Sequence, residues 1–216
     1  MKRPYITIKF AQTLDGKIAA QQGSASRISG PLALRFAHRL RSRHDAVLVG
    51  IGTVLADNPQ LTTRLVTGKN PVRVVLDSHL RIIPVPGTRI LRNVKKDGVI
   101  IFATQKATKS KIKALKSRGV EVIIVPGCKR GNIDLTQILR ILYKKGVKKL
   151  LVEGGSEIIT SFIKKQLADK IVIITAPVIF GCGMPAARLN LKLKLKSVKR
   201  MGGDIACEFV PGRVSQ

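Results

Sequence analysis

The chain has little cysteine and no long apolar run. Its 216 residues include three cysteines, Cys128, Cys182 and Cys207, which lie far apart. This spacing favours neither a disulfide framework nor a zinc site, and it is typical of a protein of the reducing cytoplasm. No apolar run approaches the ~20 residues that cross a membrane. The first residues contain no charged-then-apolar leader, so we expect a cytoplasmic location, away from any membrane.

Acidic and aromatic residues are also scarce. Twelve Asp and Glu stand against forty Lys and Arg, which gives a formal net charge of +28 at pH 7. This charge raises a basic nucleic-acid-binding protein as the alternative from a different functional class. Aromatic residues make up only 4% of the chain, however, so stacking platforms for bases are few. The basic residues are spread over almost every expected surface, which favours anionic small molecules over nucleic acid as ligands.

Metal ligands at a useful spacing and several catalytic motifs are missing. The three histidines, His38, His44 and His79, have no cysteine or acidic partner at metal-ligand spacing. There is no P-loop lysine, no serine nucleophile elbow, and neither the H-x-E nor the P-C-x-x-C element of a zinc deaminase. We therefore expect no bound metal and no deaminase domain, and residues 1–216 suit a single domain.

Apolar, strand-like runs alternate with helical patterns along the chain. The expected strands cover 5–10, 46–49, 72–76, 99–103, 120–125, 149–152, 171–174, 197–201 and 205–210. The expected helices cover 31–43, 52–56, 108–117, 134–145 and 156–166. Ser29 is the expected cap of the first helix and Asp134 that of the fourth. This order indicates an α/β fold with a mostly parallel sheet, closed by a C-terminal antiparallel hairpin. The stretch 84–96 is expected to be a long surface connection.

A Gly-x-Gly pattern follows the second expected strand. Gly50 and Gly52 would let backbone N–H groups approach a ligand, since glycine has no Cβ. Leu55 stands where a dinucleotide fingerprint needs its third glycine, so a tight turn without a ligand remains an alternative. Thr53 and Asp57 favour a ligand, because both can hydrogen-bond a cofactor at the carboxyl end of a strand, where α/β sheets bind their ligands.

A second strand ends in an acid, two glycines and a helix start, Glu153-Gly154-Gly155-Ser156. Gly154, Gly155 and Ser156 can present N–H groups to a phosphate at the helix N-terminus. Glu153 is one of only twelve acids, and it lies at the end of a strand rather than on a solvated helix face. This position favours a functional role, with a helix-capping acid as the alternative.

Three basic residues complete the candidate set. Arg41 and Arg64 carry guanidinium forks that suit a phosphate monoester. Exposed helix cations are the alternative, and we prefer it for Arg35, Arg39 and Arg43. Lys9 lies within the first strand, where it either faces a cleft and binds substrate or belongs to an edge strand.

Six segments, taken together, resemble the riboflavin-biosynthesis pyrimidine reductases. They are YITIKFAQTLDGK at 5–17, SRIS at 26–29, VGIGTVLADNPQLTTR at 49–64, PVRVVLDS at 71–78, LLVEGGS at 150–156 and APVIFG at 176–181. Their order and spacing agree with this family from Tyr5 to about Phe209. The SRIS stretch is more similar to the stand-alone archaeal diaminopyrimidinone phosphate reductases than to the reductase domain of the bacterial bifunctional deaminase-reductases. The resemblance implies a dihydrofolate-reductase-like three-layer fold and a homodimer.

The same resemblance implies an activity and a set of site residues. The activity is the NADPH-dependent reduction, with NADH possible, of the ribosyl group of a 5-phosphoribosylamino-pyrimidine to its ribitylamino form. The substrate is 2,5-diamino-6-ribosylamino-4(3H)-pyrimidinone 5′-phosphate or its deaminated uracil analogue. The implied cofactor contacts are Ala11, Arg27, Thr53, Asp57, Ser78, Gly154, Gly155, Ser156 and Glu157. The implied substrate contacts are Ser29, Arg41, Leu61, Arg64 and Glu153, with Glu153 and Lys9 as catalytic residues. A reductase of the same fold that acts on another pterin-like or pyrimidine substrate is the alternative within the enzyme class.

Overall fold

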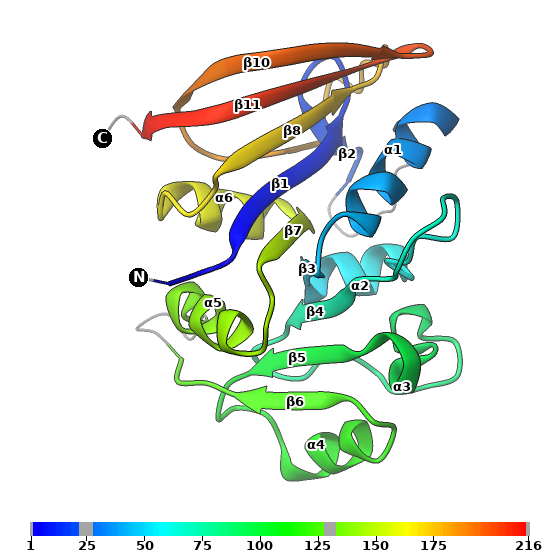
Figure 1. The fold of residues 1–216 in the computed structure, drawn as a ribbon, viewed down its shortest axis with the longest axis vertical. Coiled ribbons are helices and arrows are strands. Elements are labelled where there is room, and N and C mark those ends of the chain that lie inside the picture. Colours follow the sequence, from blue (N-terminus) through cyan, green and yellow to red (C-terminus); the bar gives the residue numbers. More distant parts are fainter. Residues whose placement is uncertain (1, 22–27, 128–132, 215–216) are drawn as a thin grey trace.

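The computed structural model describes residues 2–21, 28–127 and 133–214. Its main sheet has nine strands in the order β10-β11-β8-β1-β7-β3-β4-β5-β6 (Figure 1). Seven of them run parallel: β1 (Tyr5–Gln12), β3 (Ala46–Gly50), β4 (Val72–Leu76), β5 (Val99–Ala103), β6 (Glu121–Ile124), β7 (Lys149–Gly154) and β8 (Lys170–Thr175). The hairpin of β10 (Leu191–Met201) and β11 (Asp204–Val214) adds to β8 in antiparallel orientation. The predicted parallel sheet and C-terminal hairpin are both confirmed.

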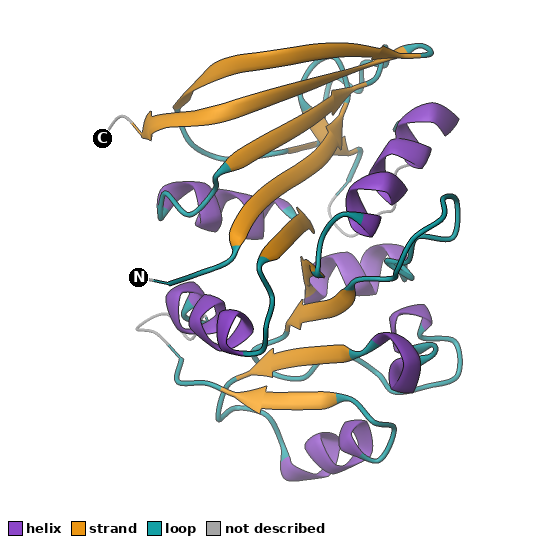
Figure 2. Ribbon diagram, in the orientation of Figure 1, coloured by secondary structure: helices purple, strands orange, loops and turns teal. Residues whose placement is uncertain are grey.

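Helices cover both faces of this sheet (Figure 2). On one face lie α5 (Leu135–Lys144) and α6 (Ser156–Lys164), and on the other lie α1 (Pro31–Ser42), α2 (Ile51–Asp57), α3 (Val94–Asp97) and α4 (Lys109–Lys116). Successive side chains of β3 divide between the two cores: Ala46 and Leu48 enter the first, Val47 and Val49 the second. A strand buried on both faces reads as a continuous apolar run, which is why the sequence identifies these strands. The three-layer α/β prediction is confirmed.

Some short elements differ from the expectation. The pair β2 (Lys17–Ala19) and β9 (Met184–Pro185) forms a small separate sheet, and segments this short show no alternation from which to predict them. The stretch 84–96 holds a 3-10 turn (Arg89–Leu91) and the start of α3 instead of an entirely open connection. Ile90 and Val94 in it are buried, and the buried guanidinium of Arg73 donates to the carbonyl of Ile90 at 2.8 Å.

The two predicted helix caps have different outcomes. Asp134 caps α5 as expected, since its Oδ1 accepts from the backbone N of Thr136 at 3.0 Å. Ser29 does not cap α1: the capping position is Gly30, with no side-chain cap. The backbone N of Gly30 instead donates to Oδ2 of Asp204 at 2.8 Å. Asp204 starts β11, far away in sequence, so local pattern gives no sign of it.

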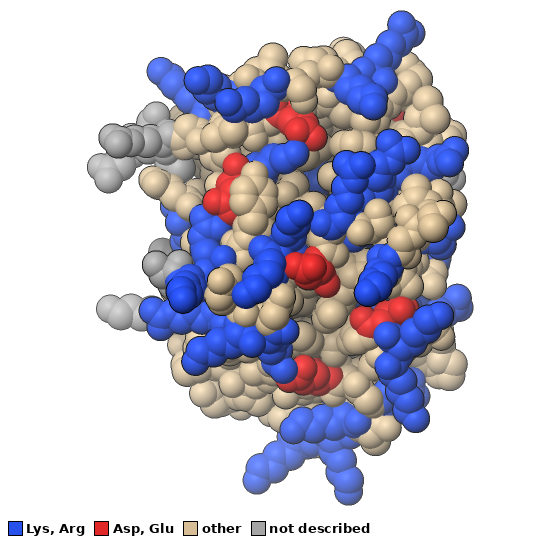
Figure 3. Space-filling model, in the orientation of Figure 1, with Lys and Arg blue, Asp and Glu red and all other residues tan. Residues whose placement is uncertain are grey.

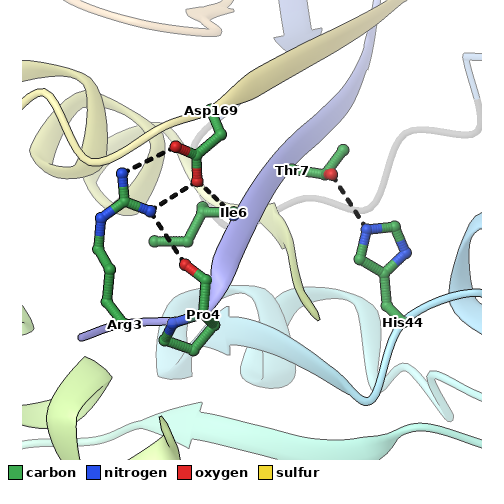
Figure 4. A network of polar contacts seen from close by, with 6 residues as sticks. All are labelled: Arg3, Pro4, Ile6, Thr7, His44 and Asp169. Carbon is green, nitrogen blue, oxygen red and sulfur yellow. Dashed lines mark hydrogen bonds and ion pairs between the residues drawn. The ribbon is translucent and has the colours of Figure 1, made fainter. Parts of the chain in front are cut away.

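A partly buried hydrogen-bond network holds the beginning of β1. Arg3 donates to both carboxylate oxygens of Asp169, at 2.6 and 2.8 Å, and to the carbonyl of Pro4 (Figure 4). Asp169 also accepts from the backbone N of Ile6 at 2.7 Å. These bonds tie the start of β1 to the residue that precedes β8.

Charge is distributed widely over the surface. Lys and Arg side chains extend across the whole face drawn in Figure 3, with a few acids between them. This agrees with the spread that the sequence predicts. Within the described ranges, no helix is long and apolar enough to cross a membrane.

Candidate active site

The two glycine junctions lie next to each other at one edge of the sheet. Strands β3 and β7 are paired neighbours, and their register continues to Val49 opposite Gly154. A Cβ built on Gly154 or Gly155 would lie 3.3 Å from Oγ1 of Thr53, so Thr53 contacts the second junction directly. Segments about 100 residues apart in sequence thus form one surface at the carboxyl ends of parallel strands, where α/β sheets bind ligands.

The junctions use their glycines in different ways. Gly155 has φ +56, in the left-handed region that favours glycine. Gly50 is extended, with φ −82. Glycine is required there because a Cβ would lie only 2.9 Å from the side chain of Ile158 in α6. Gly52 lies in α2, and a Cβ on it would meet nothing within 4 Å. The Gly-x-Gly pattern is therefore not a strained turn. Gly50 allows α6 to pack closely against β3, and the space beside Gly52 is open.

A bidentate ion pair lies at the centre of the site. Nε and Nη2 of Arg41 donate to Oε1 and Oε2 of Glu153 at 2.7 and 2.6 Å, and Nη1 donates to the carbonyl of Thr62 at 3.2 Å. The two side chains are only 11% and 7% exposed. Burial raises the pKa of the Glu153 carboxyl, but the charges and hydrogen bonds of Arg41, with help from Lys9, outweigh it and lower that pKa. Glu153 is therefore a carboxylate at neutral pH.

Lys9 faces this pair from the neighbouring strand. Strand β1 lies between β8 and β7, so the edge-strand alternative for Lys9 is wrong. Ile8 and Phe10 enter the core under α5 and α6, which turns Lys9 to the opposite face of the sheet. Burial lowers the pKa of the Lys9 ammonium, the carboxylate of Glu153 opposes this shift, and Arg41 adds to it; the net change is downward. Lys9 thus releases a proton more readily than an ordinary lysine.

The guanidinium of Arg64 is more open than that of Arg41. It is exposed in the loop after α2, and its Nη1 donates to Oγ1 of Thr62 at 3.4 Å. No ion pair within the described part of the chain includes it. Leu61, three residues earlier, has φ +55 and is only 3% exposed, so it belongs to the core.

His38 belongs to the same cluster, although the sequence analysis considered it only as a metal ligand. It is fully buried on α1, three residues before Arg41. Burial, with the charges of Arg41 and Arg64, lowers the pKa of its imidazole to about 4. Spacing of three residues places two side chains on one helix face, and this was the available signal.

The other implied cofactor contacts surround the junctions. Ser156 begins α6, and its Oγ is buried with no hydrogen-bond partner among the residues described. Glu157 is exposed in the first turn of the same helix. Ser78 follows β4, and its carbonyl accepts from the backbone N and Oγ1 of Thr104 at 3.1 and 2.8 Å. Asp57 ends α2 on the surface, and partial desolvation raises the pKa of its carboxyl.

Three implied contacts remain, and the structure describes two of them. Ala11 is on β1, partly buried beside Ala33 of α1. Ser29 precedes Gly30 and is partly buried. Arg27 lies outside the described residues. In 2–21, 28–127 and 133–214 there is no group of three or more His, Cys, Asp or Glu side chains that could hold a metal ion.

Comparison with known proteins gives consistent relatives. Residues 4–207 match the family model of the RibD C-terminal domain. The chain is 37% identical to the 2,5-diamino-6-ribosylamino-4(3H)-pyrimidinone 5′-phosphate reductase of Methanothermobacter thermautotrophicus, over 96% of this chain and 98% of that protein. It is 39% identical to the riboflavin biosynthesis protein RibD of Aquifex aeolicus, over 96% of this chain but 58% of that protein. The chain thus spans little more than half the length of such RibD relatives.

Solved structures agree with these relatives. The deaminase/5-amino-6-(5-phosphoribosylamino)uracil reductase of Thermotoga maritima superposes with a TM-score of 0.78 at 33% identity, over 97% of this chain and 57% of that chain. A dihydrofolate reductase of Enterococcus faecalis shares the fold at 13% identity, with a TM-score of 0.54 over 97% of both chains.

Proposed function

Because this chain belongs to the RibD C-terminal domain family, as the sequence resemblance predicts, we propose that it reduces the ribosyl group of a 5-phosphoribosylamino-pyrimidine with NADPH in riboflavin biosynthesis. The relative that matches over almost its whole length is named for the diaminopyrimidinone phosphate, which favours that substrate over the deaminated uracil. The observation that carries the proposal is the partly buried Lys9–Glu153–Arg41 cluster beside two glycine junctions at the carboxyl ends of parallel strands.

The start of α6 fits the phosphates of a dinucleotide. No side chain caps this helix in the described part of the chain, so its first N–H groups are available to an anion. The buried Oγ of Ser156 adds a donor without a protein partner. Gly154, Gly155 and Ser156 would hold the phosphates beside Thr53, and NADPH, when bound, supplies a hydride.

Five other residues would make the remaining contacts with the cofactor. They are Ala11, Arg27, Asp57, Ser78 and Glu157. The carboxylate of Asp57 and the hydroxyl of Ser78 suit ribose hydroxyls. An acid as exposed as Glu157, in the first turn of α6, suits contact through its backbone, because its carboxylate would repel a phosphate.

Arg64 is the better anchor for the 5′-phosphate of the substrate. Its guanidinium is exposed and unpaired by any carboxylate of the described residues, and its fork suits a phosphate monoester. Most donors of Arg41 are engaged by Glu153 and Thr62. We therefore assign Arg41 chiefly to holding these two groups, whereas the sequence led us to expect a phosphate contact from both arginines. Ser29 would complete the substrate contacts, and the buried Leu61 would support the loop from the core.

Lys9 and Glu153 act on the sugar. Glu153, kept ionised by Arg41, accepts hydrogen bonds from ribose hydroxyls and so orients the ring. Lys9 can pass a proton to the ring oxygen as the ribosylamine opens to its imine, because its lowered pKa eases that transfer. The opened sugar then presents C1′ for reduction, and the fixed neighbours Lys9 and Glu153 limit its movement.

The proposal is tested by following NADPH oxidation with both phosphoribosylamino-pyrimidines and identifying the ribitylamino product by mass. The dephosphorylated diaminopyrimidinone is the matched control, and its KM should be far higher. Substitution of NADH measures cofactor preference. Turnover of a pterin and of neither pyrimidine would support the other reductase of this fold instead. Turnover of none would overturn the proposal.

We extend the proposal to the state of the protein in the cell. The family resemblance leads us to expect a homodimer. The free thiols of Cys182 and Cys207 lead us to expect a reducing compartment, the cytoplasm. Sedimentation equilibrium at micromolar concentration measures the assembly, and a purely monomeric profile would contradict it.

A further inference from the structure

Two side chains of α1 hold the same loop. His38 and Arg41 are three residues apart on the helix, both are buried, and they therefore point from one helix face. Nη1 of Arg41 donates to the carbonyl of Thr62 at 3.2 Å. The backbone N of Leu65 donates to Nδ1 of His38 at 3.4 Å. Thr62 and Leu65 lie on either side of Arg64 in sequence, so α1 binds the loop both before and after that residue.

The hydrogen bond from Leu65 determines which tautomer the His38 imidazole adopts. Nδ1 needs a lone pair to accept this bond, so the ring proton is on Nε2. Nε2 is itself buried without a partner among the described residues. Burial and the positive charges of Arg41 and Arg64, which the carboxylate of Glu153 opposes only in part, keep the pKa of the ring at about 4. The imidazole is therefore neutral at cellular pH.

We propose that His38 is a positioning residue for the substrate phosphate, because its neutral imidazole fixes the backbone that carries Arg64. The inference rests on the proposed function, in which Arg64 binds that phosphate. Position 38 requires a hydrogen-bond acceptor that carries no charge. A lysine there would be repelled by Arg41 and Arg64, and a carboxylate would pair with Arg64 and withdraw it from the substrate.

Three variants separate positioning from mere packing. H38N keeps a neutral acceptor near the place of Nδ1, and H38L fills the space without one. H44L is the control, because His44 is a second histidine of this region and is partly buried. Its ring nitrogens contact the carbonyl of Leu40 at 2.7 Å and Oγ1 of Thr7 at 3.0 Å, the latter drawn in Figure 4, instead of the loop.

The kinetic outcomes differ between the variants. H38L should raise KM for the phosphorylated pyrimidine about tenfold, with kcat within about twofold and KM for NADPH unchanged, since only uniform substrate binding is lost. H38N should stay close to the parent protein. H44L should lower Tm without raising KM. An unchanged KM in H38L, or an equal rise in H44L, would overturn the inference.

Two further measurements keep this inference distinct from the proposed function. The amide of Leu65 should exchange with solvent faster in H38L than in the parent protein or H38N. Binding of inorganic phosphate, followed by calorimetry, should weaken in H38L as it does in R64A. If both respond but no pyrimidine is reduced, the proposed function fails and the role of His38 stands. If neither responds, the role of His38 is wrong whatever the activity.

Discussion

At the scale of single residues, one buried ion pair sets the charges of the site. Arg41 keeps Glu153 ionised, and Glu153 opposes the loss of charge from Lys9. Each of these residues would be costly to bury alone, and together they hold two cations and one anion in place. The chemistry that we propose for Lys9 and Glu153 therefore depends on Arg41, because Arg41 supports the charges of both neighbours.

Replacement of Glu153 by Gln tests this dependence. The change leaves the buried guanidinium of Arg41 without its counter-charge, so the free energy of unfolding should fall by about 3–5 kcal/mol. Loss of the sugar contact should lower kcat/KM about a hundredfold or more. E208Q is the matched control, since Glu208 pairs with Lys170 in a more exposed place and should cost at most about 1 kcal/mol. Equal effects in both variants would contradict the central role of the pair.

The buried histidines make stability depend on pH. The pKa of His38 is about 4 in the folded protein against an ordinary 6.5, so the unfolded chain takes up a proton first as pH falls. Stability is full above the ordinary value and decreases toward pH 4, by about 3 kcal/mol from this residue. His44, whose pKa burial also lowers, acts in the same direction. Urea unfolding at several pH values should show a smaller decrease in H38N, and an identical decrease would refute the assignment.

The site was predictable from sequence where a residue type was unusual for its place. Glu153 is an acid in a basic chain, and Lys9 is a charge inside an apolar strand. The pairing of Arg41 with Glu153 was not predictable, because 112 residues separate them and either could serve alone. The role of His38 was missed because its partner is a backbone N–H, which every loop offers.

At the scale of elements, the junction of β7 with α6 should be sensitive to any side chain. G155A must adopt φ +56 and place its Cβ 3.3 Å from Oγ1 of Thr53. We expect a loss of about 1–2 kcal/mol in unfolding free energy and a weaker affinity for NADPH. G52A is the comparison for stability, because its Cβ meets nothing and alanine favours a helix by about 1 kcal/mol. A stable G155A with unchanged NADPH affinity would remove this junction from the cofactor site.

Elements were predictable where burial left a pattern. The parallel strands are apolar throughout because helices cover both faces, and Asp134 caps its helix through a local bond. The caps and strands that were wrong or missed depend on distant partners. Gly30 relies on Asp204, and β2 exists only because β9 pairs with it. Interactions with partners so distant in sequence leave no local pattern from which to predict them.

At the scale of the whole molecule, the net charge of +28 should act through long-range attraction of anionic ligands. Salt screens such attraction, with a Debye length of about 10 Å at 0.1 M. We expect kcat/KM for the phosphorylated substrate to fall several-fold as ionic strength rises, while kcat stays nearly constant. The salt dependence should be smaller for the dephosphorylated substrate. A salt-dependent gel shift with nucleic acid at physiological ionic strength would instead support the nucleic-acid-binding alternative.

The central claim, that this fold delivers a hydride to the sugar of a phosphoribosylamino-pyrimidine, is tested most directly by isotope transfer. The protein is incubated with the diaminopyrimidinone phosphate and NADPH deuterated at C4 of the nicotinamide, and the product is analysed by mass spectrometry and NMR. We predict a ribitylamino product that carries one deuterium at C1′ when the labelled face of the nicotinamide is the one used, and none when the opposite face is labelled. A product without deuterium from either labelled form, or no product at all, would contradict the account.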